Sequence, residues 1–245
     1  MNESSKPSKA APTTQASSAA LEARLEAGAL MASDLGGAIG QPGVSASALA
    51  ERLRAQGSRF EKLSERLGGV SVWRVPALGD ARGLFCESYS EAALLAHLPS
   101  GVRFVQDNIV INPDAGVLRG LHWQSAPMAQ GKWIVCLAGR MHDVWVNLDP
   151  SRGPLWAWDS VVLEPGMAVW IPEGFAHGYE TLEPGTLVHY KVTAPWMPLL
   201  ERSLYWADPA LGIRWKTYAP EVSAKDQKAR TSADWLALIG EGLSS

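Results

Sequence analysis

The stretch Met141-His142-Asp143-Val144-Trp145-Val146-Asn147-Leu148 decides the fold, because its side-chain pattern has a period of two. The even positions from His142 to Leu148 oppose the odd positions from Asp143 to Asn147. Successive side chains alternate in this way when they point to opposite faces of a β-strand. Turn residues flank the stretch, with Ala138-Gly139 before it and 149–154 after it, so we predict a strand between two turns.

The same pattern continues outward from this stretch over most of the chain. Short β-rich runs are separated by turn residues at intervals of about 8–15 residues, which is typical of an antiparallel sandwich or barrel. The exception is Glu91 to Leu98, which has the pattern of a short helix. We therefore predict a mainly β fold, a cupin-type jelly-roll β-barrel with a few short helices, whose mouth holds one small ligand. The other predicted strands are Val70–Val75, Phe104–Ile111, Lys132–Leu137, Trp156–Leu163, Ala168–Ile171 and Leu187–Val192.

The first 69 residues differ in character, and we expect an N-terminal extension at 1–69 before a cupin-like β domain at 70–245. Residues 1–20 are too poor in apolar bulk to fold and are expected to be disordered. Leucine spacing predicts a short helix over 19–32 and another from about Ser47 to Leu67, ended by Gly68-Gly69. That second helix would pack on the domain, pack on a partner copy, or form a solvated linker.

A cleavable targeting peptide is the alternative interpretation of the N-terminus. The segment lacks the apolar region of a secretory signal. It also carries Glu3 and has no arginine before Arg24, which argues against a transit peptide.

Bulk composition disfavours several classes of function. A formal net charge of −3 with scattered basic residues favours neither nucleic acid nor an anionic membrane as a partner. No apolar run approaches the roughly 20 residues of a membrane span. The two cysteines, Cys86 and Cys136, provide neither a disulfide framework nor a zinc-binding spacing, so we expect a reducing, cytoplasmic location. All eleven tryptophans lie at or after Trp73, where they suit cores, interfaces and stacking sites.

The segment Val117 to Gln124 carries the clearest candidate for chemistry. It places His122 in an apolar run, three residues after Arg119. Histidine is the usual general base at neutral pH, and the arginine fork suits phosphate. The pair therefore indicates a phosphorylated or nucleotide-linked substrate. Taken alone, a histidine in such a run is more often a hydrogen-bonded core residue.

The other polar candidates are spread along the chain. His97 ends the short helix and is expected at the surface, whereas His142, His177 and His189 lie in or beside strands. The sequence contains no H-x-H pair, and its histidine spacing does not require a metal, so we predict no metal site. Pro172 and Gly174 form a turn that presents His177 at the end of a strand. Tyr190 is a proton donor with an ordinary pKa near 10, and Ser223 is predicted to cap a helix.

Eight motifs in a fixed order extend over roughly residues 70–230. They are Gly79-Asp80-Ala81-Arg82-Gly83 with Glu87-Ser88, Phe104 to Asn108, Val117 to Gln124, Gln130-Gly131-Lys132, Ile171 to Gly178, Tyr190 to Thr193, Asp208-Pro209 with Leu211 to Ile213, and Ser223 to Asp226. By these motifs the chain resembles the dTDP-4-dehydrorhamnose 3,5-epimerase family, sugar-nucleotide epimerases of the cupin superfamily.

The resemblance implies a cofactor-independent epimerase acting on a dTDP-linked 4-keto-6-deoxy sugar, the rhamnose precursor. It implies that His122 is the base, Tyr190 the acid, Asp226 the partner of His122, and Lys132 the cation beside the enolate oxygen. Arg119 matches a pyrophosphate contact, and Trp196 stands where the family has a tyrosine that stacks on thymine. A homodimer is implied, because Arg82 and Glu87 would reach the site of a neighbouring subunit. The other implied substrate contacts are Gln106, Asn108, His177, Glu201 and Lys225.

Two departures and two alternative functions accompany this resemblance. Pro195 and Ile109 stand where relatives often have an aromatic residue and a histidine, which affects the expected base and sugar. A single-site epimerase or a ketoisomerase would use the same catalytic pair. A non-catalytic nucleotide-sugar-binding cupin would not need His122, Tyr190, Lys132 and Asp226 together, so we favour the epimerase.

Overall fold

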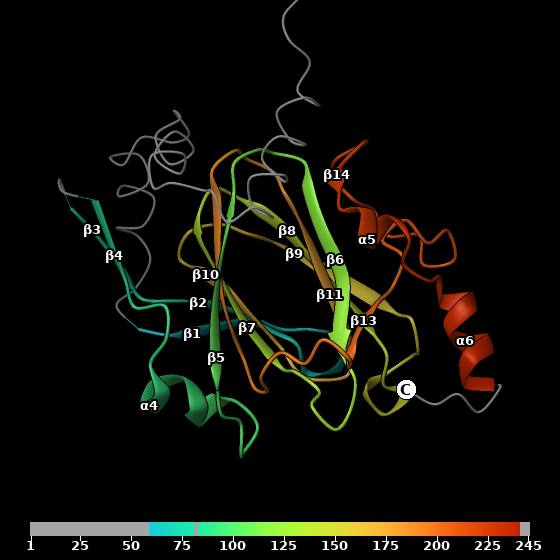
Figure 1. The fold of residues 1–245 in the computed structure, drawn as a ribbon. Helices are drawn as coiled ribbons and strands as arrows, with labels where there is room; N and C mark the ends of the chain where they lie inside the picture. The colour runs from blue at the N-terminus through green and yellow to red at the C-terminus, as the bar shows by residue number, and fades with distance from the viewer. Residues whose placement is uncertain (1–58, 81–82, 241–245) are drawn as a thin grey trace, which may run out of the picture. The chain divides into compact units, whose positions relative to one another are not determined.

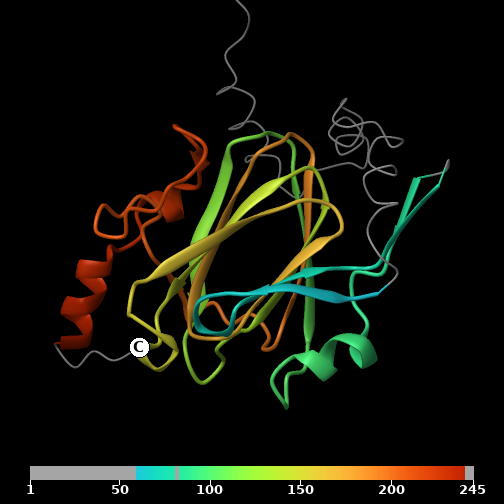
Figure 2. The same ribbon diagram turned by 180° about the vertical axis from the view of Figure 1, so that it is seen from behind.

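Two antiparallel sheets face each other in the computed structural model, which describes residues 59–80 and 83–240 (Figures 1 and 2). The first sheet has the order β1 (Glu61–Glu65), β2 (Ser71–Arg74), β10 (Met167–Ile171), β7 (Lys132–Ala138), β12 (Thr186–Val192) and β5 (Gln106–Asn112). The second has the order β13 (Glu201–Ser203), β6 (Val117–Gln124), β11 (Phe175–Thr181), β8 (Met141–Asn147) and β9 (Trp158–Leu163), with β14 (Glu221–Val222) parallel to β6.

The remaining elements are short and lie around these sheets. A hairpin of β3 (Ala77–Asp80) and β4 (Gly83–Cys86) is followed by α4 (Glu91–Leu94) and the 3-10 turn η2 (Leu95–His97). The C-terminal part holds α5 (Ala224–Gln227) and α6 (Ser232–Gly240). Two further 3-10 turns are η1 (Leu67–Gly69) and η3 (Pro150–Arg152). The predicted strands and the short helix at Glu91 to Leu98 are thus confirmed, with bounds that differ by a few residues.

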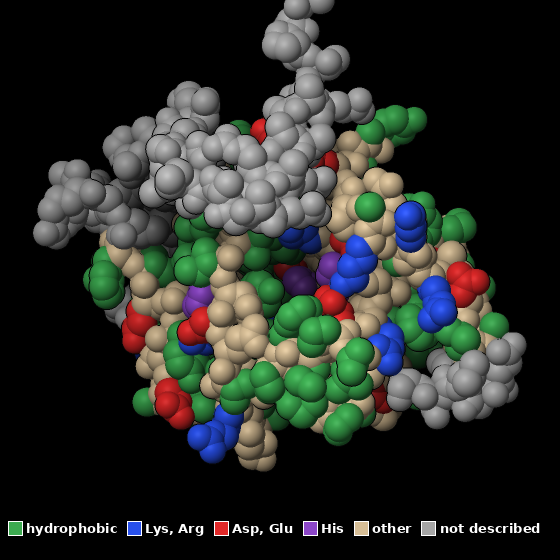
Figure 3. All heavy atoms as spheres, in the orientation of Figure 1, with side chains coloured by type: hydrophobic (Ala, Val, Ile, Leu, Met, Phe, Trp, Pro, Cys, Tyr) green, Lys and Arg blue, Asp and Glu red, His purple; other side chains and the backbone are tan. Residues whose placement is uncertain are grey.

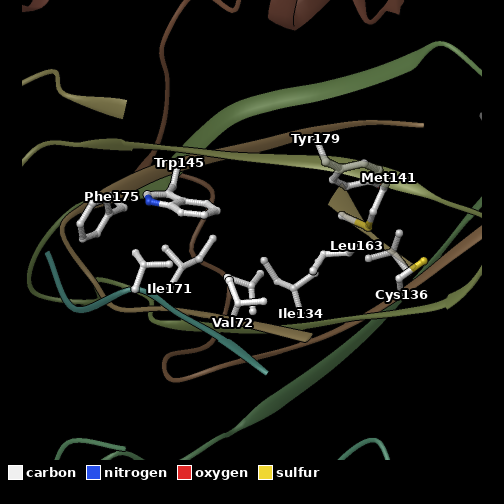
Figure 4. Packing of buried hydrophobic residues seen from close by; sticks show 12 residues of the cluster. Val72, Ile134, Cys136, Met141, Trp145, Leu163, Ile171, Phe175 and Tyr179 are labelled. Carbon is white, nitrogen blue, oxygen red and sulfur yellow. The ribbon is translucent and has the colours of Figure 1, made fainter. Parts of the chain in front are cut away.

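The main core lies between the two sheets. It joins Val72 and Ile134 from the first sheet to Met141, Trp145 and Phe175 from the second (Figure 4). Each of these side chains is almost fully buried, and burial of one such side chain is worth about 1.5–3 kcal/mol. Apolar packing therefore holds the sheets face to face at this end of the interior.

Both faces of β8 are buried, which extends the alternation seen in the sequence. Met141 and Trp145 point into the space between the sheets. Val144 and Val146 point the other way and pack with Leu204 and Leu211 from the C-terminal part of the chain. The outer face of β2, β7 and β10 in the first sheet is covered in the same manner, by a cluster that includes Trp133 and Leu94 of α4. Because apolar side chains fill these outer layers, the polar side chains of the site lie between the two sheets, at one end of the strands.

The prediction of a helix from about Ser47 to Leu67 is wrong over residues 59–67, the part of it that the structure describes. Glu61–Glu65 form strand β1, which pairs with β2 so that Glu61 lies opposite Arg74. Gly68 and Gly69 have φ angles of 64° and 87° and connect two strands instead of ending a helix. The open edge of β2 provided hydrogen bonds that leucine spacing could not reveal. The expected domain boundary at 69/70 falls inside this hairpin, and the remaining N-terminal expectations lie outside the described residues.

Candidate active site

A hollow opens at the polar end of the interior, where histidine, basic and acidic side chains gather in the middle of one face (Figure 3). Its residues come from the same inward strand faces that form the core farther along. Tyr190 shares its face of β12 with the buried Val188 and Val192, and Asp143 shares its face of β8 with Trp145. The hollow is therefore a continuation of the core in which polar side chains replace apolar ones.

A bulge in β6 brings Arg119 and His122 to the same side of the sheet. His122 lies opposite His177 and Arg119 lies opposite Tyr179, so three steps on β6 match two on β11. In a regular strand two residues three apart would point to opposite faces, and one extra residue restores a common face. At this point Gly120 has φ 122°, and a Cβ there would lie 2.5 Å from Cα of Gly178. The close approach of the two glycines thus permits the geometry of the site.

Asp226 fills a gap along the edge of β6. On the edge of β6 away from β11, β13 pairs with His122 to Gln124 and β14 pairs with Val117 and Leu118. Neither strand pairs with the backbone between these two stretches. The buried Asp226 carboxylate enters there and accepts hydrogen bonds from the backbone N–H of Gly120 at 3.3 Å and from His122 Nε2 at 2.6 Å. Ser223 caps α5 by accepting the N–H of Asp226, as the sequence predicts. The pairing of His122 with Asp226 is therefore present in the structure.

The electrostatics of this pair determine which histidine nitrogen is available. Burial alone would raise the pKa of Asp226, but hydrogen bonds from His122 and Gly120 outweigh it and hold the pKa below its ordinary value. An ionised carboxylate only accepts, so His122 Nε2 carries the proton toward it. Nδ1 of a neutral His122 is then left with its lone pair, as a base requires.

Lys132 and a second histidine–aspartate pair form the floor of the hollow. The ammonium of Lys132, 8% exposed, donates to the carbonyl oxygen of His122 at 3.1 Å. Burial lowers the pKa of Lys132 to about 8, although Asp143 and Glu201 oppose the change. His177 Nε2 bonds Asp143 Oδ2 at 2.8 Å, and burial lowers the pKa of His177 despite that carboxylate. Asp143 Oδ1 is buried with no hydrogen-bond partner in the described part of the chain.

Tyr190 stands on the opposite sheet from His122, beside Asn108 of β5. Burial raises the pKa of its hydroxyl, Glu201 adds to that effect, and Arg119 opposes it. The hydroxyl therefore stays protonated at neutral pH and is suited to donate a proton.

The remaining predicted contacts form linked pairs around the mouth. Gln106 donates to Asn108 Oδ1 at 2.8 Å and accepts the backbone N–H of Trp196 at 2.9 Å. Trp196 is 55% exposed, and a tryptophan exposed to this extent is suited to stacking. Lys225 Nζ lies 2.7 Å from Glu201 Oε2, so these two oppositely charged side chains sit together.

Sequence comparison identifies the family. Residues 64–234 match the profile described as dTDP-4-dehydrorhamnose 3,5-epimerase. The chain is 42% identical over 163 residues to the dTDP-4-dehydrorhamnose 3,5-epimerase of Salmonella typhimurium, which covers 65% of this chain and 88% of that protein. It is 37% identical over 175 residues to the enzyme of that name from Sinorhizobium fredii, covering 71% and 88%. This chain belongs to the dTDP-4-dehydrorhamnose 3,5-epimerase family.

Solved structures with these names share the fold. The dTDP-6-deoxy-D-glucose-3,5-epimerase of Legionella pneumophila, in complex with dTDP-4-keto-L-rhamnose, matches with a TM-score of 0.68 at 33% identity, covering 76% of this chain and 97% of that one. The enzyme from Bacillus anthracis, with TDP and pyrophosphate bound, matches with a TM-score of 0.66 at 33% identity, covering 70% and 99%. The predicted cupin-type fold and the resemblance to this epimerase family are confirmed.

One substrate contact expected for this epimerase family, Glu87, is not brought to the hollow within one chain. Arg82 lies outside the described residues. Glu87 is exposed and follows the β3–β4 hairpin, which projects on the opposite side of the sandwich from α5 (Figures 1 and 2).

The sequence pattern did not indicate Asp143 or Asn112 as site residues, although both side chains are wholly buried beside the hollow. The signal for Asp143 was a carboxylate in the middle of an apolar strand.

Over the described ranges, no three His, Cys, Asp or Glu side chains are grouped as ligands of one metal ion, and no helix there is long and apolar enough to cross a membrane.

Proposed function

We propose that this protein inverts C3 and C5 of a dTDP-linked 4-keto-6-deoxy sugar and so supplies the precursor of dTDP-L-rhamnose. The relatives named above support the substrate class. The observation that carries the mechanism is the 2.6 Å bond between His122 and the ionised Asp226, beside a buried lysine and across from a protonated tyrosine. This arrangement supports the assignment of a base and an acid to opposite sides of one hollow.

In the proposed reaction, Nδ1 of His122 removes a proton from the carbon next to the C4 ketone. The C–H electron pair becomes the C=C bond of an enolate, and the carbonyl π pair moves to O4. The ammonium of Lys132 stabilises that oxygen, an effect worth roughly 3–4 kcal/mol for one well-placed donor. Asp226 stabilises the imidazolium that forms. No electron leaves the substrate, so the reaction needs no redox cofactor.

Inversion is completed from the opposite face of the ring. Tyr190 donates its phenolic proton to the enolate carbon, where the C=C pair forms the new C–H bond while an electron pair on O4 re-forms the C4=O4 double bond. Solvent then returns a proton to the phenolate, and His122 releases its proton to solvent. A positioned acid or base contributes roughly 10²- to 10⁴-fold to the rate. The same steps at C3 and at C5 give the doubly inverted product.

The nucleotide would be held at the mouth of the hollow. Arg119 is assigned to the diphosphate, and Trp196 presents its exposed ring to the base. Gln106, Asn108, His177, Glu201 and Lys225 are assigned to the remaining sugar and nucleotide contacts. Tryptophan at position 196 retains a stacking face without a hydroxyl group.

We also propose a homodimer in which Arg82 and Glu87 complete the hollow of the neighbouring subunit. Two exposed apolar pairs support it. Leu78 and Phe85 face each other across the β3–β4 hairpin and are 60% and 70% exposed. Val105, directly before β5, and Ile109, on the outward side of β5, are 57% and 66% exposed. Light scattering should give a dimer mass for the wild type and a smaller mass for Phe85→Asp.

The mechanism is tested by incubation with dTDP-4-keto-6-deoxyglucose in deuterated water, followed by NMR of the sugar protons. The wild type should exchange both the C3 and the C5 protons. His122→Ala should abolish exchange at both carbons, whereas Tyr190→Phe should still exchange but invert poorly. Full exchange by His122→Ala would remove His122 from the role of base, and unchanged turnover by Tyr190→Phe would remove Tyr190 from the role of acid.

His97→Ala is the matched control, because this histidine ends η2 and packs on Trp73, away from the hollow. It should exchange at the wild-type rate. Exchange at C3 alone in the wild type would replace the proposal with a single-site epimerase.

A further inference from the structure

Asn112 is a fully buried side chain at the end of β5, and it contacts the arginine assigned to the diphosphate. Its Oδ1 accepts a hydrogen bond from Nε of Arg119 at 2.9 Å. Its Nδ2 donates to the carbonyl oxygen of Thr186 at 3.1 Å and lies 3.3 Å from the hydroxyl of Tyr179. All the polar atoms of this amide thus have partners.

These partners determine which way the amide faces. The carbonyl oxygen of Thr186 can only accept, so the nitrogen of the amide must face it. The oxygen of the amide is therefore turned toward Arg119. Asn112 is held on one side by the backbone of β12 and holds Arg119 on the other.

The contact leaves the working end of Arg119 free. A guanidinium has five N–H donors in a planar fork, and the bond to Asn112 uses only the one on Nε. The four donors on the two terminal nitrogens remain, and they are the set that can bind phosphate oxygens in a bidentate way. No carboxylate within the described ranges forms an ion pair with Arg119, which is itself exposed to the hollow. A neutral acceptor orients the cation without cancelling its charge.

We propose that Asn112 is a positioning residue that orients Arg119 for the diphosphate of the nucleotide. The inference rests on the proposed function, because that function assigns Arg119 to the diphosphate. Asn112 has the right chemistry for the role and aspartate does not. An aspartate would neutralise the arginine and would face the oxygen of Thr186 with a second acceptor.

The test is calorimetric binding of dTDP and of thymidine to the wild type, Asn112→Ala, Arg119→Ala and the double variant. Asn112→Ala should weaken dTDP about tenfold, equivalent to about 1.4 kcal/mol, and leave thymidine unchanged. In the Arg119→Ala background the second substitution should weaken dTDP no further, because Asn112 acts through Arg119. An unchanged dTDP affinity in Asn112→Ala, an equal loss for thymidine, or an equal loss in the Arg119→Ala background would overturn the inference.

Asn147→Ala is the matched control for a purely structural loss. Asn147 is equally buried, donates to the carbonyl oxygens of Gly153 and Pro154 at 3.0 Å, and lies four residues beyond Asp143, roughly 13 Å along β8. It should lose stability as Asn112→Ala does and bind dTDP like the wild type.

Asn112→Asp keeps the shape of the side chain and serves if the alanine variant does not fold. It should weaken dTDP more than tenfold, and wild-type affinity in it would contradict the positioning role. Absence of dTDP binding by the wild type would overturn the proposed function itself. Wild-type binding without an effect at Asn112 overturns only this inference.

Discussion

Lys132→Met is expected to make the protein more stable and inactive, because the buried charge of Lys132 opposes folding. Burial takes the pKa of this lysine from 10.5 to about 8. At about 1.4 kcal/mol for each pKa unit, folding with a charged Lys132 costs about 3 kcal/mol relative to the neutral amine. The attraction of Asp143 and Glu201 is already contained in this figure, since it opposes the fall in pKa. Loss of the hydrogen bond to the carbonyl of His122 offsets about 1–2 kcal/mol, so the net gain is about 1–2 kcal/mol at pH 7.

The pH dependence of the gain follows from the same pKa. Between pH 8 and 10.5 the unfolded chain binds more protons at Lys132 than the folded chain does, so wild-type stability from this residue rises with pH. Below pH 8 the full free-energy cost of burying the charged ammonium of Lys132 opposes folding. The advantage of Lys132→Met should therefore be largest at neutral pH and fall by about 2 kcal/mol by pH 10.

Urea unfolding of both proteins at pH 7 and pH 10 measures this difference, and taking the difference cancels groups that titrate alike in both. Lys62→Met is the control, since Lys62 is 39% exposed, pairs with Glu65 and lies 5.7 Å from the ring centroid of Trp73, and it should change stability by less than about 1 kcal/mol. A variant at position 132 that is less stable than wild type at pH 7, or whose advantage is independent of pH, would refute the reasoning. Epimerase activity should be lost in either case.

Three further predictions concern other parts of the structure. The kcat/KM of the wild type should fall above about pH 8 as Lys132 loses its proton, and Lys132→Arg should move that alkaline limb upward in a pH–rate profile, because arginine stays charged. Gly120→Ala should destabilise the fold by more than about 3 kcal/mol, since its Cβ would meet Gly178 at 2.5 Å, whereas Gly101→Ala, with nothing within 4 Å, should cost only about 1–2 kcal/mol by thermal unfolding. Glu180→Gln should lower the free energy of unfolding by about 2–4 kcal/mol, because this wholly buried carboxylate accepts hydrogen bonds from His142 and from the backbone N–H groups of Lys216 and Thr217. A loss below about 1 kcal/mol in urea unfolding would show that Glu180 does not anchor the segment leading to α5.

The C-terminal helix shows a local signal that sequence analysis did not use. Thr231 and Asp234 bond each other reciprocally, with the backbone N–H of each received by the side chain of the other at 2.8 and 3.2 Å. This is the capping-box pattern of a threonine followed three residues later by an acid, and α6 begins there. The helix was therefore predictable from residues 231–234.

The hairpin of β1 and β2 shows the opposite case, in which a local pattern misled. Phe60, Leu63 and Leu67 have helical spacing, yet Phe60 packs near Trp133 with ring centroids 6.3 Å apart, and Leu63 lies on an edge strand. Helical spacing over a few residues is weak when a neighbouring strand offers a ladder of hydrogen bonds. Only the tertiary fold makes that edge available.

The sequence by itself determined seven of the strands (β2, β5, β7 to β10 and β12), their turns and the residue types of the site, because alternation and turn chemistry are local properties. It also indicated a helix cap at Ser223, just before Asp226, whereas the roles expected of His122, Lys132 and Tyr190 came from the resemblance to the epimerase family. Tertiary structure alone decided that a bulge turns Arg119 and His122 to one face, that Asp226 fills the gap on β6, and that Asn112 holds Arg119. These features depend on which strands pair with one another and on which side chains the packed sheets bury away from water. Such contacts join residues up to 106 positions apart, beyond the reach of any local pattern.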